Sequence, residues 1–223
     1  MKKRSCAIEF LLIFALFVLP PLTQGPASQP PRPALYPIQV FTNALCMALI
    51  LYIQTKAAPR KKPEAGPRWL RCTVTAAAAL AAFGGLCLSA SLIQLTLYLL
   101  SGSQPATPLT LLQPESLPAW INCITGTAAA AFFEEALFRR YLPDTLAILL
   151  PKKDSRPSRA AAELIPLALF ALSHRYLGTP SVINALACGL VLRLCTLKAG
   201  SLLPAVAAHT AYNGALLILS FGM

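Results

Sequence analysis

Apolar residues in this chain gather into seven long runs, separated by short stretches rich in proline, glycine or basic residues. The hydrocarbon core of a bilayer is about 30 Å thick and is crossed by about 20 residues of helix. Most of the runs reach or approach that length. The pattern predicts an all-α fold, a polytopic transmembrane helical bundle of about seven spans, at residues 5–19, 36–55, 72–100, 119–142, 161–177, 181–197 and 201–221.

Composition narrows the class of protein. Of the 223 residues, 56% are hydrophobic and 12% are charged, whereas a soluble domain carries about 25% charged residues. So few charges, clustered as they are, do not cover the surface of a soluble domain of this length. The composition therefore disfavours a soluble globular enzyme and favours a membrane protein.

The excess of basic residues predicts an orientation. There are 19 Lys and Arg against 8 Asp and Glu, and most of the basic residues lie at the N-terminus, in the loop 56–71 and after the fourth run. The positive-inside rule places these clusters in the cytoplasm, with the N-terminus inside and only Arg32 and Arg175 on the outer side. No basic patch is interleaved with aromatic residues, so we expect no nucleic-acid partner.

Three regions follow from this pattern: residues 1–35 with a signal-like span and a proline-rich linker, 36–114 with further spans and the basic loop, and 115–223 as the core that holds the polar residues described below. No clean cleavage site follows the first run, which favours an uncleaved span over a signal peptide for residues 1–24, although both interpretations stay open. The MKKR start favours a bacterial cytoplasmic membrane.

Charged residues within the fourth run are costly, by about 2.5 to 3.5 kcal/mol for a charged side chain at the centre of a span. Glu135 and Arg139 are four residues apart, so they share a helix face and are expected to form an ion pair. Glu134 is rotated by about 100° from that face and lacks this partner. An unpaired carboxylate in an apolar, partly wet cavity suits a general base.

Both histidines of the chain, His174 and His209, lie within apolar runs, and Asn213 follows His209 by four residues on the same helix face. Each residue alone is consistent with a structural hydrogen bond inside a bundle. Their occurrence together with Glu134 on three different spans predicts one cavity that collects all four side chains.

The remaining polar and sulfur side chains receive structural interpretations. Glu163 and Asn184 lie at or near span ends, and we expect interfacial or capping roles for them. The seven cysteines are odd in number, lie in or beside apolar runs and lack CxxC spacing. They are expected to be small buried hydrophobic residues rather than disulfide or zinc ligands.

Three short motifs occur in order along the chain: Glu134-Glu135-x-x-x-Arg139, Phe170-x-x-x-His174 and His209-x-x-x-Asn213. Together they resemble the CPBP family of intramembrane proteases, the CAAX-processing and bacteriocin-immunity group that includes the Rce-type prenyl-protein endopeptidase. The resemblance covers roughly residues 115–220, and the first hundred residues resemble the family only in being membrane spans.

The resemblance implies an intramembrane endopeptidase that cleaves membrane-associated peptides or proteins. Glu134 would activate the hydrolytic water with the help of His174, while His209 and Asn213 would stabilise the oxyanion, and the ion pair of the first motif would support the site. These roles match the needs of amide hydrolysis, which requires a base and preorganised donors.

Metal dependence stays open at this stage. The helix-borne HExxH zinc signature is absent. Glu134, His174 and His209, from separate helices, are nevertheless of the types that form a three-ligand catalytic site for a divalent metal such as zinc.

Two functions of other classes also stay open. One is a non-catalytic immunity or scaffold protein with the same fold. The other is a transporter or proton relay that uses the buried Glu and His residues, although no internal repeat is visible. The expected partners are the lipid bilayer and a membrane-associated substrate, and neither the substrate nor the oligomeric state follows from the sequence.

Overall fold

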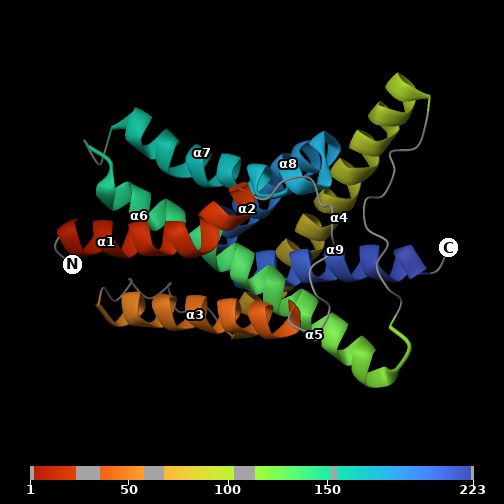
Figure 1. Cartoon of the computed structure of the whole chain (residues 1–223), viewed down its shortest axis with the longest axis horizontal. Helices are drawn as coiled ribbons and strands as arrows, with labels where there is room; N and C mark the ends of the chain where they lie inside the picture. The colour runs from red at the N-terminus through yellow and green to blue at the C-terminus, as the bar shows by residue number, and fades with distance from the viewer. Residues whose placement is uncertain (1–2, 24–35, 58–67, 103–113, 152–154, 222–223) are drawn as a thin grey trace.

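The computed structural model describes residues 3–23, 36–57, 68–102, 114–151 and 155–221, and every regular element within these ranges is helical (Figure 1). The predicted all-α fold is confirmed. The elements are α1 (Lys3–Ile13), η1 (Phe14–Val18), α2 (Leu19–Thr23), α3 (Tyr36–Ala57), α4 (Arg68–Ser101), α5 (Leu117–Glu134), η2 (Glu135–Tyr141), α6 (Leu142–Leu149), α7 (Arg156–Leu172), η3 (Arg175–Leu177), α8 (Thr179–Ala199) and α9 (Leu203–Phe221).

Each of the seven predicted spans coincides with a helix or with a rod of consecutive helices. By length and composition alone, four stretches are long and apolar enough to cross a membrane: Arg4–Thr23, Pro37–Lys56, Cys72–Ser101 and Thr179–Ala199, with Leu203–Leu219 as a shorter apolar helix. The number of crossings and the side of the N-terminus stay predictions. Most of the proline-rich linker and of the basic loop lies outside the described residues.

Local sequence signals explain where several helices begin and end. Ser116 and Ser155 precede α5 and α7, and the side chain of each accepts a hydrogen bond from the backbone N–H three residues later. Such caps satisfy donors that the first helical turn leaves free. Gly178 and Gly200 have φ angles of 93° and 62°, which glycine adopts without steric cost. The two turns around α8 therefore lie where the sequence predicts them.

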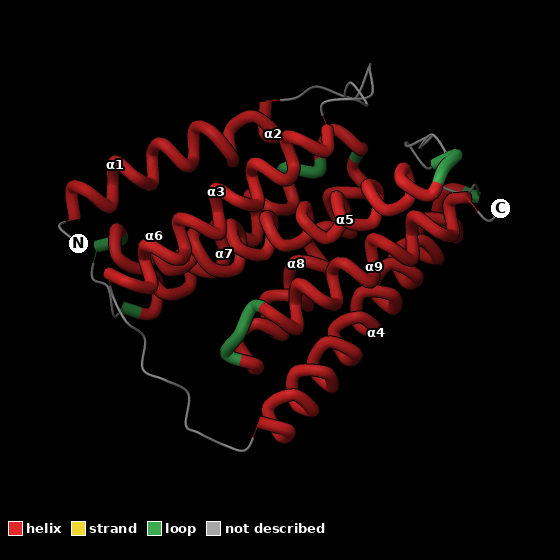
Figure 2. The backbone as a smooth tube through the Cα atoms, turned by 90° about the horizontal axis from the view of Figure 1, so that it is seen from below, coloured by secondary structure: helices red, strands yellow, loops and turns green. Residues whose placement is uncertain are grey.

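The α5–η2–α6 rod occupies the middle of the bundle. It contacts α3 and α9 through α5, α7 and α8 through η2, and α1 and α7 through α6. Figure 2 shows α1 and α4 at opposite edges of this arrangement. The first motif therefore lies on the rod that most of the other helices surround.

Buried apolar side chains form two clusters. One surrounds η2 and includes Val18, Met47, Leu137 and Tyr141, and the other lies between α4, α8 and α9. Large apolar side chains also cover the outside, such as Leu100 of α4 with 80% exposure. A bundle that is apolar on its outer faces suits a lipid environment, in which outward-facing hydrocarbon carries no penalty.

The cysteines confirm part of their interpretation. All seven are free thiols, and Cys6, Cys188 and Cys195 are buried. The expectation of burial is wrong for Cys72, which is exposed because it lies near the start of α4, beyond the packed part of that helix.

Helix α4 runs without interruption for 34 residues, about 50 Å at a rise of 1.5 Å per residue. This length exceeds the hydrocarbon core of a bilayer, and an unbroken helix of this length fits that core by tilting. Gly85 lies where α4 approaches α8, since a Cβ atom there would stand 3.1 Å from Val191 Cγ1. A Cβ on the neighbouring Gly84 would meet nothing within 4 Å.

We expect the change Gly85→Leu to lower the thermal midpoint of the detergent-solubilised protein, because overpacking a close helix contact costs about 1 to 3 kcal/mol. The change Gly84→Leu adds the same side chain one position away in open space, and it should leave the midpoint unchanged or raise it. Equal midpoints for the two variants would contradict the close α4–α8 approach.

Candidate active site

The central rod changes its winding where the first motif begins. The π-helix η2 starts at Glu135, and at its end the N–H of Leu142 donates to the carbonyl of Leu137, five residues earlier. Short π-helical segments within α-helices occur frequently at functional sites. All residues of η2 except Arg140 are buried, so this segment carries its charged side chains into the bundle.

Glu135 has no exposed surface and faces two positively charged or protonatable groups. Its Oε1 atom lies 2.9 Å from His209 Nδ1 and 3.5 Å from Arg139 Nη1. The expected ion pair between Glu135 and Arg139 is therefore present. A buried charge is tolerated when it is paired, and here the partners come from the same rod and from α9.

Arg139 is also held by an aromatic ring. Its guanidinium carbon lies 3.8 Å from the centroid of the Phe170 ring, a geometry that is favourable for a cation over an aromatic face. The Phe170 ring lies 4.8 Å from the ring of His174 and 6.5 Å from that of His209. The first residue of the second motif thus lies close to residues of all three motifs.

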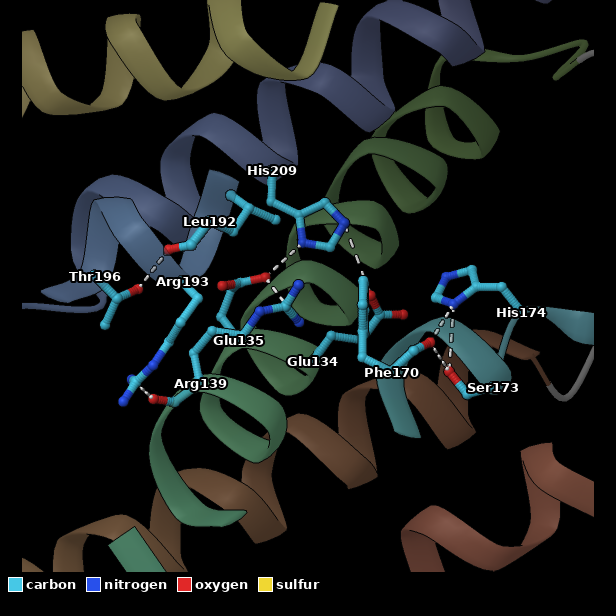
Figure 3. Close-up of polar contacts among 10 residues, drawn as sticks. All are labelled: Glu134, Glu135, Arg139, Phe170, Ser173, His174, Leu192, Arg193, Thr196 and His209. Atoms are coloured by element: carbon cyan, nitrogen blue, oxygen red, sulfur yellow. Dashed lines mark hydrogen bonds and ion pairs between the residues drawn. The ribbon is translucent and has the colours of Figure 1, made fainter. Parts of the chain in front are cut away.

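Glu134 lies on the other side of His209. Its side chain is 27% exposed, and its Oε2 atom is 3.7 Å from His209 Nε2. The expectation that Glu134 is unpaired is therefore wrong, because α9 supplies a partner that periodicity within one helix does not reveal. Figure 3 shows the imidazole between the two glutamates, with Nδ1 toward Glu135 and Nε2 toward Glu134.

His174 occupies a separate position at the end of α7. Its Nδ1 atom is 2.8 Å from the carbonyl oxygen of Phe170 and 3.3 Å from Ser173 Oγ (Figure 3). A ring that donates Nδ1–H to a backbone carbonyl keeps Nε2 as its second functional nitrogen. Within the described part of the chain, the hydrogen bonds and ion pairs of His174 do not join it to Glu134.

Asn213 lies one turn after His209 on α9 and is partly buried. The structure thus brings Glu134, Glu135, Arg139 and His209 into one polar cluster, and among the described contacts it links neither His174 nor Asn213 to this cluster directly. The single cavity predicted for the four residues stays a prediction.

Glu163 and Asn184 do not cap helix ends, since both lie inside helices and their side chains join neighbouring helices. Their expected interfacial position stays a prediction. The side chain of Asn184 donates to Tyr212 Oη at 3.5 Å, so it joins α8 to α9. The carboxylate of Glu163 accepts two hydrogen bonds from Arg193, each 2.5 Å long. Arg193 was not singled out in the sequence, although a basic residue within an apolar run is itself a signal.

The residues proposed for a metal do not fit one in this arrangement. No group of three or more His, Cys, Asp or Glu side chains among the described residues could hold a metal ion. His174 directs its Nδ1 atom to a backbone carbonyl, while Glu134 and His209 face each other without it. Metal dependence stays a prediction, and the steps proposed below are derived for the protein groups.

The fold and the site define a membrane-embedded helical protein with a buried cluster of glutamate, arginine and histidine. Residues 116–215, from α5 into α9, match the family model described as Type II CAAX prenyl endopeptidase Rce1-like, so this part of the chain is similar to that family. The matched region contains all three motifs and confirms the resemblance that they carry. It supports an intramembrane protease of the CAAX type. No curated protein and no solved structure matches the chain.

We expect the change Glu135→Ala to destabilise the protein strongly, since it leaves Arg139 as a buried charge without a counter-charge, a loss of about 3 to 5 kcal/mol. The change Arg140→Ala is the matched control. It breaks the Arg140–Asp144 pair, which has the same spacing on the same rod but is 25% and 44% exposed, and such pairs contribute at most about 1 kcal/mol. Thermal unfolding in detergent measures both variants. A midpoint for Glu135→Ala no lower than that of Arg140→Ala would contradict the buried pairing.

Proposed function

We propose that this protein is an intramembrane endopeptidase that hydrolyses peptide bonds of membrane-associated substrates with a water molecule activated by Glu134. The observation that carries the proposal is the orientation of His209, whose Nδ1 faces the buried Glu135 at 2.9 Å while its Nε2 faces the partly exposed Glu134 at 3.7 Å. This cluster lies within the segment that matches the protease family.

Glu134 is the general base of the proposal. The two adjacent glutamates differ in access, since the side chain of Glu134 is 27% exposed and that of Glu135 is not exposed at all. A base must lie within hydrogen-bond reach of the proton that it removes, and such a group contributes about 10²- to 10⁴-fold to the rate. Of these two glutamates, only Glu134 has exposed surface at which a water molecule and a peptide carbonyl can approach.

His209 is the proposed stabiliser of the oxyanion, and Glu135 orients it. When Nδ1–H donates to Glu135, the ring is fixed, and in the protonated ring Nε2–H is a second donor. Asn213 lies one helical turn further along α9, so its side-chain amide is the second proposed donor. Donors that are fixed before the reaction stabilise the developing negative charge without reorganisation.

His174 is proposed to assist Glu134. The bond from Nδ1 to the Phe170 carbonyl, 2.8 Å long, fixes the ring and leaves Nε2 for the water or the substrate. The proposal requires the water to lie between Nε2 of His174 and the carboxylate of Glu134 when a substrate is bound.

The family description suggests the first substrate class to test, which is prenylated peptides ending in a CAAX sequence. A bacterial cytoplasmic membrane, proposed from the MKKR start, favours other membrane-associated peptides. The experiments therefore need both a defined peptide and an open search. They also distinguish hydrolysis from the immunity, scaffold and transport functions.

The variant Glu134→Gln should abolish hydrolysis and leave the thermal midpoint close to that of the wild type, because the amide keeps the size of the side chain and removes the base. Cleavage of a farnesylated CAAX peptide in proteoliposomes measures the first property. Membrane proteomics of cells that carry the wild type or the variant searches for other substrates.

Full cleavage by Glu134→Gln would contradict the proposal. Identical proteomes, together with an intact cellular phenotype in the variant, would favour a scaffold or immunity protein. Substrate flux that survives the loss of hydrolysis would favour a transporter.

The variants His209→Asn and His209→Gln distinguish the roles of the two ring nitrogens of His209. The Asn side chain places a donor near the position of Nδ1 and lacks Nε2, so His209→Asn should keep the contact with Glu135 and the thermal midpoint. Its kcat should fall by about 10²- to 10³-fold, the cost of one oxyanion donor. Because Gln reaches toward the Nε2 position, His209→Gln should lose more stability. Wild-type kcat in His209→Asn would exclude His209 from the reaction.

A further inference from the structure

One arginine, Arg193, joins α7, α8 and η2 next to the polar cluster. Arg193 of α8 donates from Nε and Nη2 to the carboxylate of Glu163 on α7. Its Nη1 donates to the backbone carbonyl of Arg139 in η2 at 2.6 Å (Figure 3). The two helices are adjacent in sequence, but η2 lies more than fifty residues earlier in the chain. A planar guanidinium with several fixed donors suits such a three-way contact.

Arg193 binds a carbonyl that lies beside a missing donor of the backbone. At the α spacing residue 143 would donate to the carbonyl of Arg139, and at the five-residue spacing of η2 it would donate to that of Phe138. That residue is Pro143, which has no N–H. A backbone carbonyl that is buried without a donor costs free energy comparable to a lost hydrogen bond. Arg193 donates to one of these two carbonyls, that of Arg139.

Both the side chain and the backbone carbonyl of Arg139 are therefore held by other groups. Its side chain faces Glu135 and the ring of Phe170, and its carbonyl is held from α8. Close approach of α8 makes this possible, because a Cβ atom at Gly189, one turn before Arg193, would stand 2.7 Å from Leu167 Cδ1 and 3.5 Å from Arg139 Nη2. A small cavity lined in part by Arg139, Glu163, Gly189 and Arg193 adjoins the contact, so water can compete for the carbonyl when the guanidinium is removed.

We propose that Arg193 is a positioning residue. With Glu163 it holds the carbonyl of Arg139, beside the donor that Pro143 lacks, and fixes the C-terminal end of the π-helical segment, which begins next to Glu134. The effect of Arg193 on turnover rests on the proposed function, whereas its effect on the structure of the π-helical segment does not. The pairing of Glu163 with Arg193 keeps the guanidinium in place and compensates its charge.

Hydrogen exchange measured by mass spectrometry on the detergent-solubilised full chain tests the structural part, because amide protection reports local opening. The variant Arg193→Ala should speed exchange in peptides that cover residues 135–142 and leave peptides from α4 unchanged. Arg193→Lys should restore part of the protection, since one ammonium donates to the carbonyl or to Glu163 but lacks the fork that serves both. Lys198→Ala, an exposed cation on the same helix, is the control and should behave as the wild type.

The double variant Arg193→Ala with Pro143→Ala provides the sharpest test. Alanine at position 143 restores an N–H that can donate to the carbonyl of Arg139, so protection of residues 135–142 should return toward the wild-type level. A purely packing role of Arg193 would give no such rescue. Unchanged exchange in Arg193→Ala, uniformly faster exchange over all helices, or absence of rescue by Pro143→Ala would each overturn the inference.

Turnover of the farnesylated CAAX peptide, or of the substrate that proteomics identifies, tests the functional part. Arg193→Ala should lower kcat by about 10- to 100-fold through misplaced reacting groups, with KM unchanged, and the double variant should recover part of kcat. If the wild type cleaves nothing, the proposed function fails while the exchange result still decides the structural role. If Glu134→Gln is inactive but Arg193→Ala keeps wild-type kcat, the positioning role alone is overturned.

Discussion

The arrangement of this bundle depends on one carboxylate that has no contact with solvent. Glu135 lies in the centre of the structure, where an unpaired charge would be prohibitively unfavourable. It is tolerated because Arg139 neutralises it from the next turn and His209 contacts it from α9. The requirement for these partners joins the last helix to the central rod, and the same contact leaves the far side of the imidazole facing Glu134. A constraint on stability therefore also organises the candidate site.

The backbone of the rod serves the same arrangement. The π-helical winding over Glu135–Tyr141 directs nearly all of its side chains inward, and the carbonyl of Arg139 lies four residues before Pro143, which has no N–H. Arg193 binds that carbonyl and brings α7 and α8 against the rod. Phe170 completes the enclosure by stacking on Arg139 and lying beside both histidines. The three motifs thus converge through the side chain of Arg139 and the ring of Phe170, rather than through direct contacts among all the proposed catalytic residues.

The sequence predicted those features that are set within one helix. Apolar runs located the helices, and the four-residue spacing predicted the Glu135–Arg139 ion pair. The position of His209 between the two glutamates was not predictable, because it depends on how α9 is rotated against α5. The pair between Glu163 and Arg193 was missed for the same reason, since its members are thirty residues apart on different helices. The π-helix η2 was not predicted either, because periodicity arguments assume the regular 3.6-residue turn throughout.

The central claim is that Glu135 orients His209 so that its other nitrogen faces Glu134. The chain contains two histidines, so ¹⁵N-histidine labelling gives only two sets of ring signals, and the variant His174→Gln assigns them. Solid-state NMR in lipid bilayers should show that Glu135→Gln shifts Nδ1 of His209, that Glu134→Gln shifts its Nε2, and that the ring of His174 responds to neither change. Ring signals of His209 that are insensitive to both substitutions would contradict the account.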